Sequence, residues 1–411
     1  MHRIYGAKQR QNHLGGTSAC YNVGIDVAKS KHDCCILNEN GKALSTFVIK
    51  NNKQGFEELI AEITRFSSVS DLSDAKIGLE STGHYSINIQ NYLLQKRLCV
   101  RIYNPLSVNL LRKAQSLRKT KTDKSDCKFL ATLLFSDDSK SYSQPVLPIS
   151  ELRNLTRNRH RLVSMRSKLK LSLSRLITIL FPELPSAVWS VNQKSCYAML
   201  SEFPTAQDIA KASIVRLTNV LSANSKGRYG REKAEHIREL ARNSIGHNSG
   251  AVGFELRQTI RLIQNLQSEI VLLDKEIRQI MDDIQSPVLS IPGIGYVLGA
   301  IIISEIGSIE NFTNPAKLLA FAGLDPSIYQ SGQYNASSTP MVKRGSTYLR
   351  WGLMQAARLV AYRDETFSTY FGKKLSEGKH YYVALTHVAK KLVRVLFHLL
   401  RTGQNFAPQF G

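Results

Sequence analysis

The chain opens with short apolar runs that alternate with stretches of helical spacing. Three extended runs lie within residues 21–50, and the Asn-Gly pair in "NENGK" between the last two is typical of a hairpin turn. Apolar spacing predicts a helix over 53–66, and we expect a strand over 75–80, a helix over 86–98 and a strand over 99–104. Strands that alternate with helices predict a mixed α/β sheet, which here begins with three antiparallel strands.

The second part of the chain is predicted to be helical. A polar segment with two prolines, "SDDSKSYSQPVLPIS", predicts a linker, and residues 186–250 are predicted to form several shorter helices. Between them a long helix is predicted over 151–181. Its apolar side carries Leu152, Leu155, Leu162, Met165, Leu169, Leu173 and Leu176.

A second long helix is predicted over 256–284, where apolar residues recur mostly in steps of three and four. This spacing is the seam of a coiled coil, with one irregular step between positions 263 and 266. A coiled coil needs a partner helix. The partner is either the 151–181 helix, folded back as an antiparallel hairpin, or the same helix in another subunit.

The last part begins with a Pro-Gly-Ile-Gly turn before an apolar helix, in "SIPGIGYVLGAIIISEIG". Gly293 and Gly295 resemble the hairpin of a helix-hairpin-helix motif, where small residues let backbone amides approach a phosphate. The alternative is a tight turn without a ligand, because glycine also serves wherever the chain needs an unusual dihedral angle.

Charge points to the kind of partner. The 411 residues include 55 Lys and Arg against 32 Asp and Glu, a formal net charge of +23, and so much positive charge predicts attraction to a polyanion. Nucleic acid is the first candidate, and a basic but otherwise ordinary soluble protein is the alternative.

Cysteine usage and hydropathy indicate the compartment. The six cysteines form no C-x-x-C pair and no repeated spacing, which fits a reduced protein. The first twenty residues lack the apolar core of an export signal, and no stretch reaches the eighteen consecutive apolar residues of a membrane span. We expect a cytoplasmic protein that is not attached to a membrane.

Four carboxylates stand where a two-metal nuclease of the RNase H type needs them. Asp26 lies in the first strand, Glu80 ends the fourth, and Asp123 and Asp126 share one face of the following helix. Taken singly, these residues are equally consistent with a strand-end turn, a solvated edge and a helix start. Together they predict a site for two Mg²⁺ ions, because Mg²⁺ prefers oxygen ligands and a metal pair stabilises both the attacking and the leaving oxygen.

Lysines surround the aspartate pair, and we expect them to contact the phosphates of the nucleic acid that reaches the metals. They are Lys119, Lys121 and Lys124. The basic helix over 150–181 is a second expected contact surface. Its candidate residues are Arg157, Arg161 and Lys168.

The motifs of the chain, taken together, resemble the DEDD transposases of the bacterial insertion-sequence family one-hundred-ten, and also the related Piv-type DNA invertases. The resemblance covers nearly the whole chain from Tyr21. The motifs that carry it are "VGIDVAKSKHD", "IGLESTGHYS", "NPLSVNLLRKAQSLRKTKTDKSDCKFLA", "IPGIG", "FAGLDPSIYQSGQYN" and "KRGSTYLRWGLMQAA".

The resemblance implies a multidomain α/β plus α architecture. We expect a tail over 1–20, a RuvC-like (RNase H-type) DEDD domain over 21–145, a helical coiled-coil arm over 146–285, and a mostly helical transposase domain over 286–411. It also implies a bacterial protein that associates with the nucleoid, and a bridge RNA, encoded by the mobile element, that specifies donor and target DNA. We expect a homo-oligomer, either dimer or tetramer.

The resemblance further implies a serine nucleophile before a glycine, which on this chain is Ser331. A serine hydroxyl that attacks a phosphodiester forms a covalent link that conserves bond energy for rejoining. The family often has two small hydroxyl residues before the glycine, whereas Gln330 precedes Ser331 here. A turn serine without a reaction is the alternative, and Ser327, Ser337, Ser338 and Ser346 rank lower as nucleophiles.

Near the serine, "KRGSTYLR" supplies further cations. We expect Lys343, Arg344 and Arg350 to hold phosphates, against the alternative of solvated surface charge. The whole pattern predicts a transposase that cuts and rejoins DNA. The rivals are a RuvC-like resolvase that hydrolyses DNA with water, and a non-catalytic RNA-binding scaffold.

Overall fold

The computed structural model describes residues 21–66, 72, 75–81, 83–115, 123–136, 147–327, 330–331, 334–335 and 341–407. The chain divides into two compact units, Met1–Gln144 and Pro145–Gly411, and each is described by itself. No helix among the described residues is long and apolar enough to cross a lipid bilayer.

The first unit contains a five-stranded mixed sheet with the order β3-β2-β1-β4-β5. β1, β2 and β3 are antiparallel neighbours, while β4 and β5 run parallel to β1, which confirms the predicted sheet and its antiparallel start. The strands are β1 (Tyr21–Val27), β2 (Lys31–Leu37), β3 (Ala43–Lys50), β4 (Ala75–Glu80) and β5 (Cys99–Tyr103).

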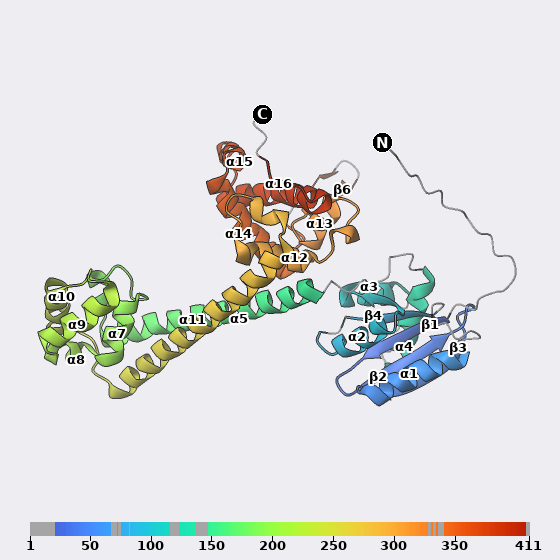
Figure 1. Cartoon of the computed structure of the whole chain (residues 1–411), viewed down its shortest axis with the longest axis horizontal. Coiled ribbons are helices and arrows are strands. Elements are labelled where there is room, and N and C mark those ends of the chain that lie inside the picture. The colour runs from blue at the N-terminus through green and yellow to red at the C-terminus, as the bar shows by residue number, and fades with distance from the viewer. Residues whose placement is uncertain are drawn as a thin grey trace. The chain divides into compact units, whose positions relative to one another are not determined.

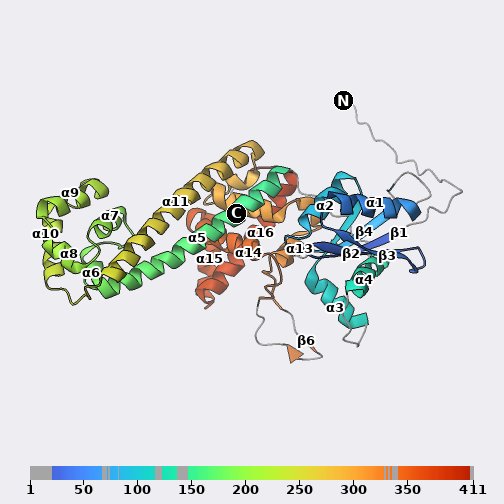
Figure 2. The same ribbon diagram turned by 90° about the horizontal axis from the view of Figure 1, so that it is seen from below.

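Helices cover both faces of this sheet, as Figure 2 shows. α1 (Lys53–Phe66) and α2 (Ile87–Gln95) pack on one face, where Phe56 and Leu93 join the core around Ile25 and Ile77. The other face carries α3 (Pro105–Gln115) and α4 (Asp123–Ser136), and α4 packs against β1, β2 and β4. α4 is the element that matters for the site.

The second unit is built on two long antiparallel helices, α5 (Leu147–Leu180) and α11 (Gly250–Ile284), which lie side by side (Figure 1). Ion pairs join Arg175 with Glu255 near one end and Arg159 with Asp274 further along. The partner of α11 within this chain is therefore α5, one of the two alternatives left by the sequence. α5 begins four residues earlier than predicted, with Pro148 in its first turn, where proline is tolerated.

Short helices gather at one end of this pair and the C-terminal helices at the other (Figure 1). The first group is α6 (Leu184–Ala187), α7 (Lys194–Glu202), α8 (Ala206–Lys211), α9 (Ile214–Ser225) and α10 (Arg231–Arg242). The second is η2 (Pro287–Ser290), α12 (Tyr296–Ile306), η3 (Ile309–Asn311), α13 (Pro315–Phe321), β6 (Gln330–Ser331), β7 (Tyr334–Asn335), α14 (Thr347–Arg363), α15 (Glu365–Ser376) and α16 (Tyr381–Thr402). Each group has its own buried core.

Candidate active site

Two glycines on neighbouring strands let α4 lie directly on the sheet. A Cβ atom built on Gly24 of β1 would lie 1.9 Å from the carbonyl oxygen of Cys127 and 2.5 Å from the backbone nitrogen of Ala131. On Gly78 of β4 it would lie 3.1 Å from the carbonyl oxygen of Leu130. Only glycine permits the approach at position 24, so the close seat of α4 follows from the residues of these strands.

Asp26 and Glu80 lie two residues beyond these glycines and therefore share the face of the sheet that α4 covers. β1 and β4 are parallel, and their register pairs Ile25 with Leu79, immediately before the two carboxylates. Asp26 and Glu80 thus leave adjacent strands at the same level and toward the same side.

The first turn of α4 lies toward the strand ends that carry these carboxylates. Cys127 lies over Gly24, and Ala131, one turn further along, packs with Leu37, which lies beside the start of β1. Asp123 is the first residue of α4, one turn before Cys127, and its side chain is outside the described set. The backbone arrangement therefore brings the start of α4 to the carboxyl ends of β1 and β4.

Asp126 is held by an arginine. Its carboxylate is buried, and its two oxygens lie 3.1 and 3.2 Å from the two terminal nitrogens of Arg112 in α3. The hydroxyl of Ser125 donates a further hydrogen bond of 3.2 Å to the same carboxylate. A cation at Arg112 thus partly offsets the negative charge that the carboxylates place at this edge of the sheet.

A further buried carboxylate, Asp33, stands beside Asp26. The antiparallel register of β1 and β2 pairs the two residues directly, so both side chains leave the same face of the sheet. Asp33 is 6 % exposed and forms an ion pair with Lys31 at 3.8 Å. Sequence reasoning missed Asp33, because its place beside Asp26 comes from the pairing of β1 with β2, and no local period in "KHDCCIL" marks that neighbour.

The chemistry of these residues fits Mg²⁺, because Asp26, Glu80 and Asp126 offer carboxylate oxygens and no soft ligand. Among the side chains that the structure describes, no three His, Cys, Asp or Glu residues form a group able to hold a metal ion, and Asp123 is not in that set. The metal site therefore stays a prediction.

Two cysteine side chains, one in α4 and one in β2, pack α4 against the sheet. Cys35 of β2 and Cys127 of α4 lie in one buried cluster. A hydrogen bond with Cys127 lowers the pKa of Cys35, because it stabilises the Cys35 thiolate, while burial opposes this shift. The same hydrogen bond, together with burial, raises the pKa of Cys127. This pair fixes the second turn of α4 against β2.

Ser331 lies in a small hairpin of the second unit. β6 and β7 pair antiparallel, with Ser331 opposite Tyr334. The segment that carries the hairpin is closed at its base by a bridge between Pro326 and Met341. The side chain of Ser331, and residues 336–340 with Ser337 and Ser338, lie outside the described set.

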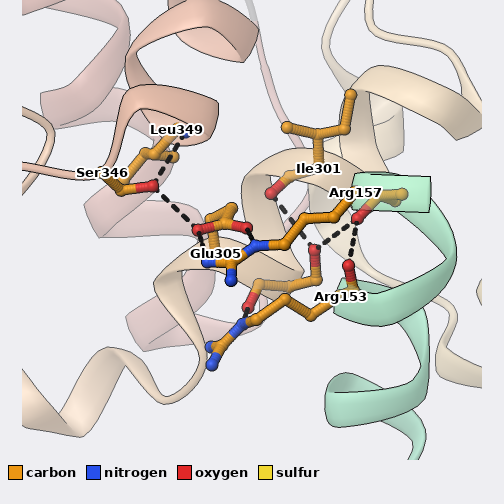
Figure 3. A network of polar contacts seen from close by, with 8 residues as sticks. Arg153, Arg157, Ile301, Glu305, Ser346 and Leu349 are labelled. Carbon is orange, nitrogen blue, oxygen red and sulfur yellow. Dashed lines mark hydrogen bonds and ion pairs between the residues drawn. The ribbon is translucent and has the colours of Figure 1, made fainter. Parts of the chain in front are cut away.

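A buried glutamate connects α5, α12 and α14 (Figure 3). Glu305 of α12 is 3 % exposed and accepts hydrogen bonds of 2.6 and 2.9 Å from Arg157 of α5. The hydroxyl of Ser346 donates to the same carboxylate at 2.8 Å and accepts from the backbone of Leu349 at 3.1 Å, which caps α14. Glu305 thereby fixes the start of α14 on the long helix.

The structure gives Arg157 a protein partner, where sequence reasoning expected a nucleic-acid phosphate. The Nε and one terminal nitrogen of Arg157 both donate to Glu305, and this hydrogen bonding raises the pKa of Arg157. The guanidinium also lies 4.9 Å from the ring centre of Tyr348. Arg153, one turn earlier, donates a 2.7 Å bond to the carbonyl oxygen of Ser304. Both arginines therefore serve the α5–α12 contact.

Three other predicted phosphate contacts also have packing roles. Gly293 adopts a φ of +94°, and a Cβ there would lie 3.0 Å from the backbone of Leu359 in α14. Arg350 donates a 3.2 Å bond to the carbonyl oxygen of Lys343, whose own φ is +55°. These residues shape the turn before α12 and the loop before α14.

The remaining candidates differ in how they are placed. Arg161 and Lys168 are exposed on α5, Arg344 is exposed on its loop, and open space surrounds Gly295. Lys119 and Lys121 lie outside the described residues, as does the side chain of Lys124. Their contacts with nucleic acid stay predictions.

Two protein-family models match the chain, and both describe transposases. Residues 23–182 match the model of DEDD transposases of the IS110 type, described as "Transposase". Residues 285–372 match the model described as "Transposase IS116/IS110/IS902 family". The first match contains all four predicted carboxylates and the second contains Ser331.

Similarity to individual proteins extends over most of the chain. It is 26 % identical over 397 residues to the insertion element IS116 44.8 kDa protein of Streptomyces clavuligerus, covering 94 % of this chain and 96 % of that protein. It is 25 % identical over 412 residues to the insertion element IS900 42 kDa protein of Mycobacterium paratuberculosis, covering 94 % and 97 %. It is 22 % identical over 391 residues to the pilin gene-inverting protein of Moraxella bovis, covering 93 % and 97 %.

Proposed function

We propose that this chain, which belongs to the IS116/IS110/IS902 family of transposases, excises and inserts its mobile element through a covalent phosphoserine intermediate, with Mg²⁺ and a bridge RNA. Transposase activity itself follows from the family. The metal, the serine and the RNA are the finer parts of the proposal.

One observation carries the proposal. Gly24 and Gly78 seat α4 on the sheet so that its first turn lies toward Asp26 and Glu80. Carboxylates that share one edge of a sheet repel one another unless cations offset their charge, and cation-dependent phosphoryl chemistry gives a reason for that placement. Two other readings of these carboxylates, strand-end turns and helix starts, leave their common edge unexplained.

In the proposed site Asp26, Glu80, Asp123 and Asp126 hold the metal. Bound Mg²⁺, two ions in our proposal, supplies charge stabilisation for the phosphate and for the leaving oxygen. The carboxylates orient the site from three rigid elements. Arg112 holds Asp126 in place through its two contacts and adds a positive charge next to this carboxylate.

Ser331 supplies the nucleophile in this proposal. Its hydroxyl oxygen attacks a DNA phosphorus, and a new serine oxygen–phosphorus bond forms as the bond to one sugar oxygen breaks. The hydroxyl proton passes to a base, and the departing sugar oxygen ends as a hydroxyl. Rejoining reverses these changes, because a sugar hydroxyl of another strand attacks the phosphoserine and restores serine.

We propose a bridge RNA as the second nucleic-acid partner, and a dimer or tetramer as the working form. The net charge of +23 supports a polyanionic partner, and Arg161 and Lys168 leave an exposed basic face on α5. Sequencing of the noncoding DNA that flanks the gene tests the RNA directly, because a structured RNA must be encoded there if the protein is guided.

The serine is tested by trapping the covalent adduct. Wild type with Mg²⁺ and a labelled DNA substrate is expected to give a DNA adduct that survives denaturation, and Ser331→Ala is expected to give none. Ser331→Ala removes one oxygen from a hairpin and should cost little stability, so a lost adduct is chemical. Ser327→Ala, a matched change on the same segment, is expected to keep the adduct.

Both variants should bind DNA as wild type does. An adduct in the Ser331→Ala variant would move the nucleophile elsewhere, with Ser337 and Ser338 next to test. A wild type that recombines DNA without any adduct would instead support hydrolysis by the carboxylate site alone, as in a resolvase.

A further inference from the structure

Three tyrosines stand exposed where α14, α15 and α16 meet. Tyr362 at the end of α14 is 84 % exposed, and Tyr381 and Tyr382 at the start of α16 are 42 % and 65 % exposed. The rings of Tyr381 and Tyr382 lie 5.3 Å apart and nearly perpendicular, and His380 stacks on Tyr382 at 5.9 Å. We call Tyr362, Tyr381 and Tyr382 the tyrosine platform.

An open cavity lies against this platform. It has a volume of ≈ 510 Å³, and its lining includes Tyr362, Tyr381, Phe371 and Arg358. Phe371 packs edge to face on Tyr381, with ring centres 5.5 Å apart, so one face of the aromatic pair is supported from within the protein. The volume lies within the range of pockets that hold small planar ligands.

The exposed side of α14 continues the aromatic and basic character away from the cavity. Trp351, Arg358 and Tyr362 follow one another at spacings of seven and four residues, so they share one helical face. Trp351 is 38 % exposed, and its ring lies 5.1 Å from that of His160. The face thus offers successive ring surfaces with a cation between them.

Cations lie close to these rings in the structure and in the chain. Arg358 lines the same cavity as Tyr362 and Tyr381, and Lys379 immediately precedes His380 and the two tyrosines of α16. Positive charge is therefore available at the platform for contacts with phosphates.

We propose that the tyrosine platform binds unpaired nucleotides of a single-stranded nucleic acid, with bases stacked on its rings and phosphates on the surrounding cations. Proteins that bind single-stranded nucleic acid without sequence preference combine exposed aromatic rings with a basic groove. Every base can stack on such a ring, and every phosphate carries a charge that the groove can bind. A duplex hides its base faces and therefore gains only the charge contacts. The inference rests on the proposed function for nucleic acid as the partner, and not on the cleavage chemistry.

Fluorescence anisotropy in the presence of EDTA tests this without any reaction. The probes are a labelled 15-nucleotide oligo-dT, a labelled 15-nucleotide oligo-U and a labelled duplex of 15 base pairs. The double variant Tyr362→Ala/Tyr382→Ala is expected to bind the single strands at least about tenfold more weakly, and the duplex within about twofold of wild type. The stronger of the two single-strand arms identifies DNA or RNA as the ligand.

Two further variants separate stacking from damage to the fold. Tyr362→Phe/Tyr382→Phe keeps both rings and is expected to bind within about threefold of wild type. Trp189→Ala removes an aromatic ring that is 93 % exposed in the α6–α10 group, and is expected to leave single-strand binding unchanged. Circular dichroism melting must give one thermal midpoint for all variants.

Equal single-strand affinity of the alanine variant and wild type overturns the proposal, and so does an equal loss on single strands and duplex. A shift in sedimentation of the alanine variant without any change in single-strand binding also overturns it, in favour of a contact between protein copies. The serine adduct of the previous section is measured separately, so the proposed chemistry and this site fail or succeed independently.

Discussion

Arg157 and Glu305, 148 residues apart in the chain, join α5 to α12 through two hydrogen bonds of 2.6 and 2.9 Å. Glu305 is almost fully buried, and Arg157 is 44 % exposed in its side chain. Ser346 donates to the same carboxylate, so the pair also holds α14, the helix that follows the segment with Ser331. A residue that looks like a surface cation from its sequence neighbours is therefore a structural contact.

We predict that Arg157→Gln lowers the free energy of unfolding by about 2 kcal/mol, because it leaves the buried carboxylate of Glu305 without its cation. The value lies below that of a fully buried pair because Arg157 is partly solvated. Arg161→Gln, one turn along the same helix, removes an exposed arginine that donates a hydrogen bond to Asn158, and it should change stability by less than about 0.5 kcal/mol. Urea denaturation of the two variants measures both; equal midpoints would contradict the structural role.

The exposed basic face of α5 gives a separate prediction. Arg161→Gln together with Lys168→Gln should weaken nucleic-acid binding and reduce the slope of log affinity against log salt by up to about one per lost phosphate contact. Because neither side chain is buried, stability should not change. Affinities measured at four salt concentrations give the slope, and a slope equal to that of wild type would mean that this face is only solvated.

Removal of a carboxylate should abolish cleavage and leave the fold intact. We predict this for Asp26→Asn and for Asp126→Asn, since a lost metal ligand removes charge stabilisation of the leaving oxygen. An excision assay measures the loss, and circular dichroism checks the fold. A folded Asp26→Asn protein that excises at a near-normal rate would disprove the two-metal assignment.

A histidine of α16, His387, should report phosphate binding to the lysines near it through its pKa. In the free protein the pKa of His387 is held below its usual 6.5 by burial and by Lys390, Lys374 and Lys379. Phosphates bound to these lysines offset their charge, so the pKa of His387 should rise on addition of oligo-dT. Binding then takes up a proton, and affinity should increase as pH falls through the pKa of the bound state.

Imidazole NMR signals, titrated with and without the oligonucleotide, measure this shift. The His387→Gln variant assigns the signal and should lose the pH-dependent part of the affinity. A pKa that stays in place while oligo-dT binds would put the phosphates away from His387.

Local sequence patterns predict the strands of the sheet. Contacts between residues that are far apart in the chain cannot be predicted from such patterns. The three extended runs and the Asn-Gly turn predict the antiparallel start, and helical spacing predicts the helix over 53–66. Residues that meet only through the packing of strands or helices show no periodic pattern in the sequence. This is why Asp33 beside Asp26 and Glu305 beside Arg157 were missed. Met165 is predicted on the apolar side of its helix, yet its side chain is 53 % exposed. The spacing of apolar residues predicts the side of a helix on which a side chain lies, but not whether another element packs against it there.

The seat of α4 on Gly24 has a consequence for how the chemistry is kept. A single methyl group at this position would meet the carbonyl oxygen of Cys127 at 1.9 Å, and the whole helix would have to lift to admit it. Displacement of a reacting group by about 1 Å is enough to cost roughly a hundredfold in rate. The exact position of α4 relative to the carboxylates thus depends on Gly24, a residue that has no reactive atom. Gly24 contributes space, because it has no side chain.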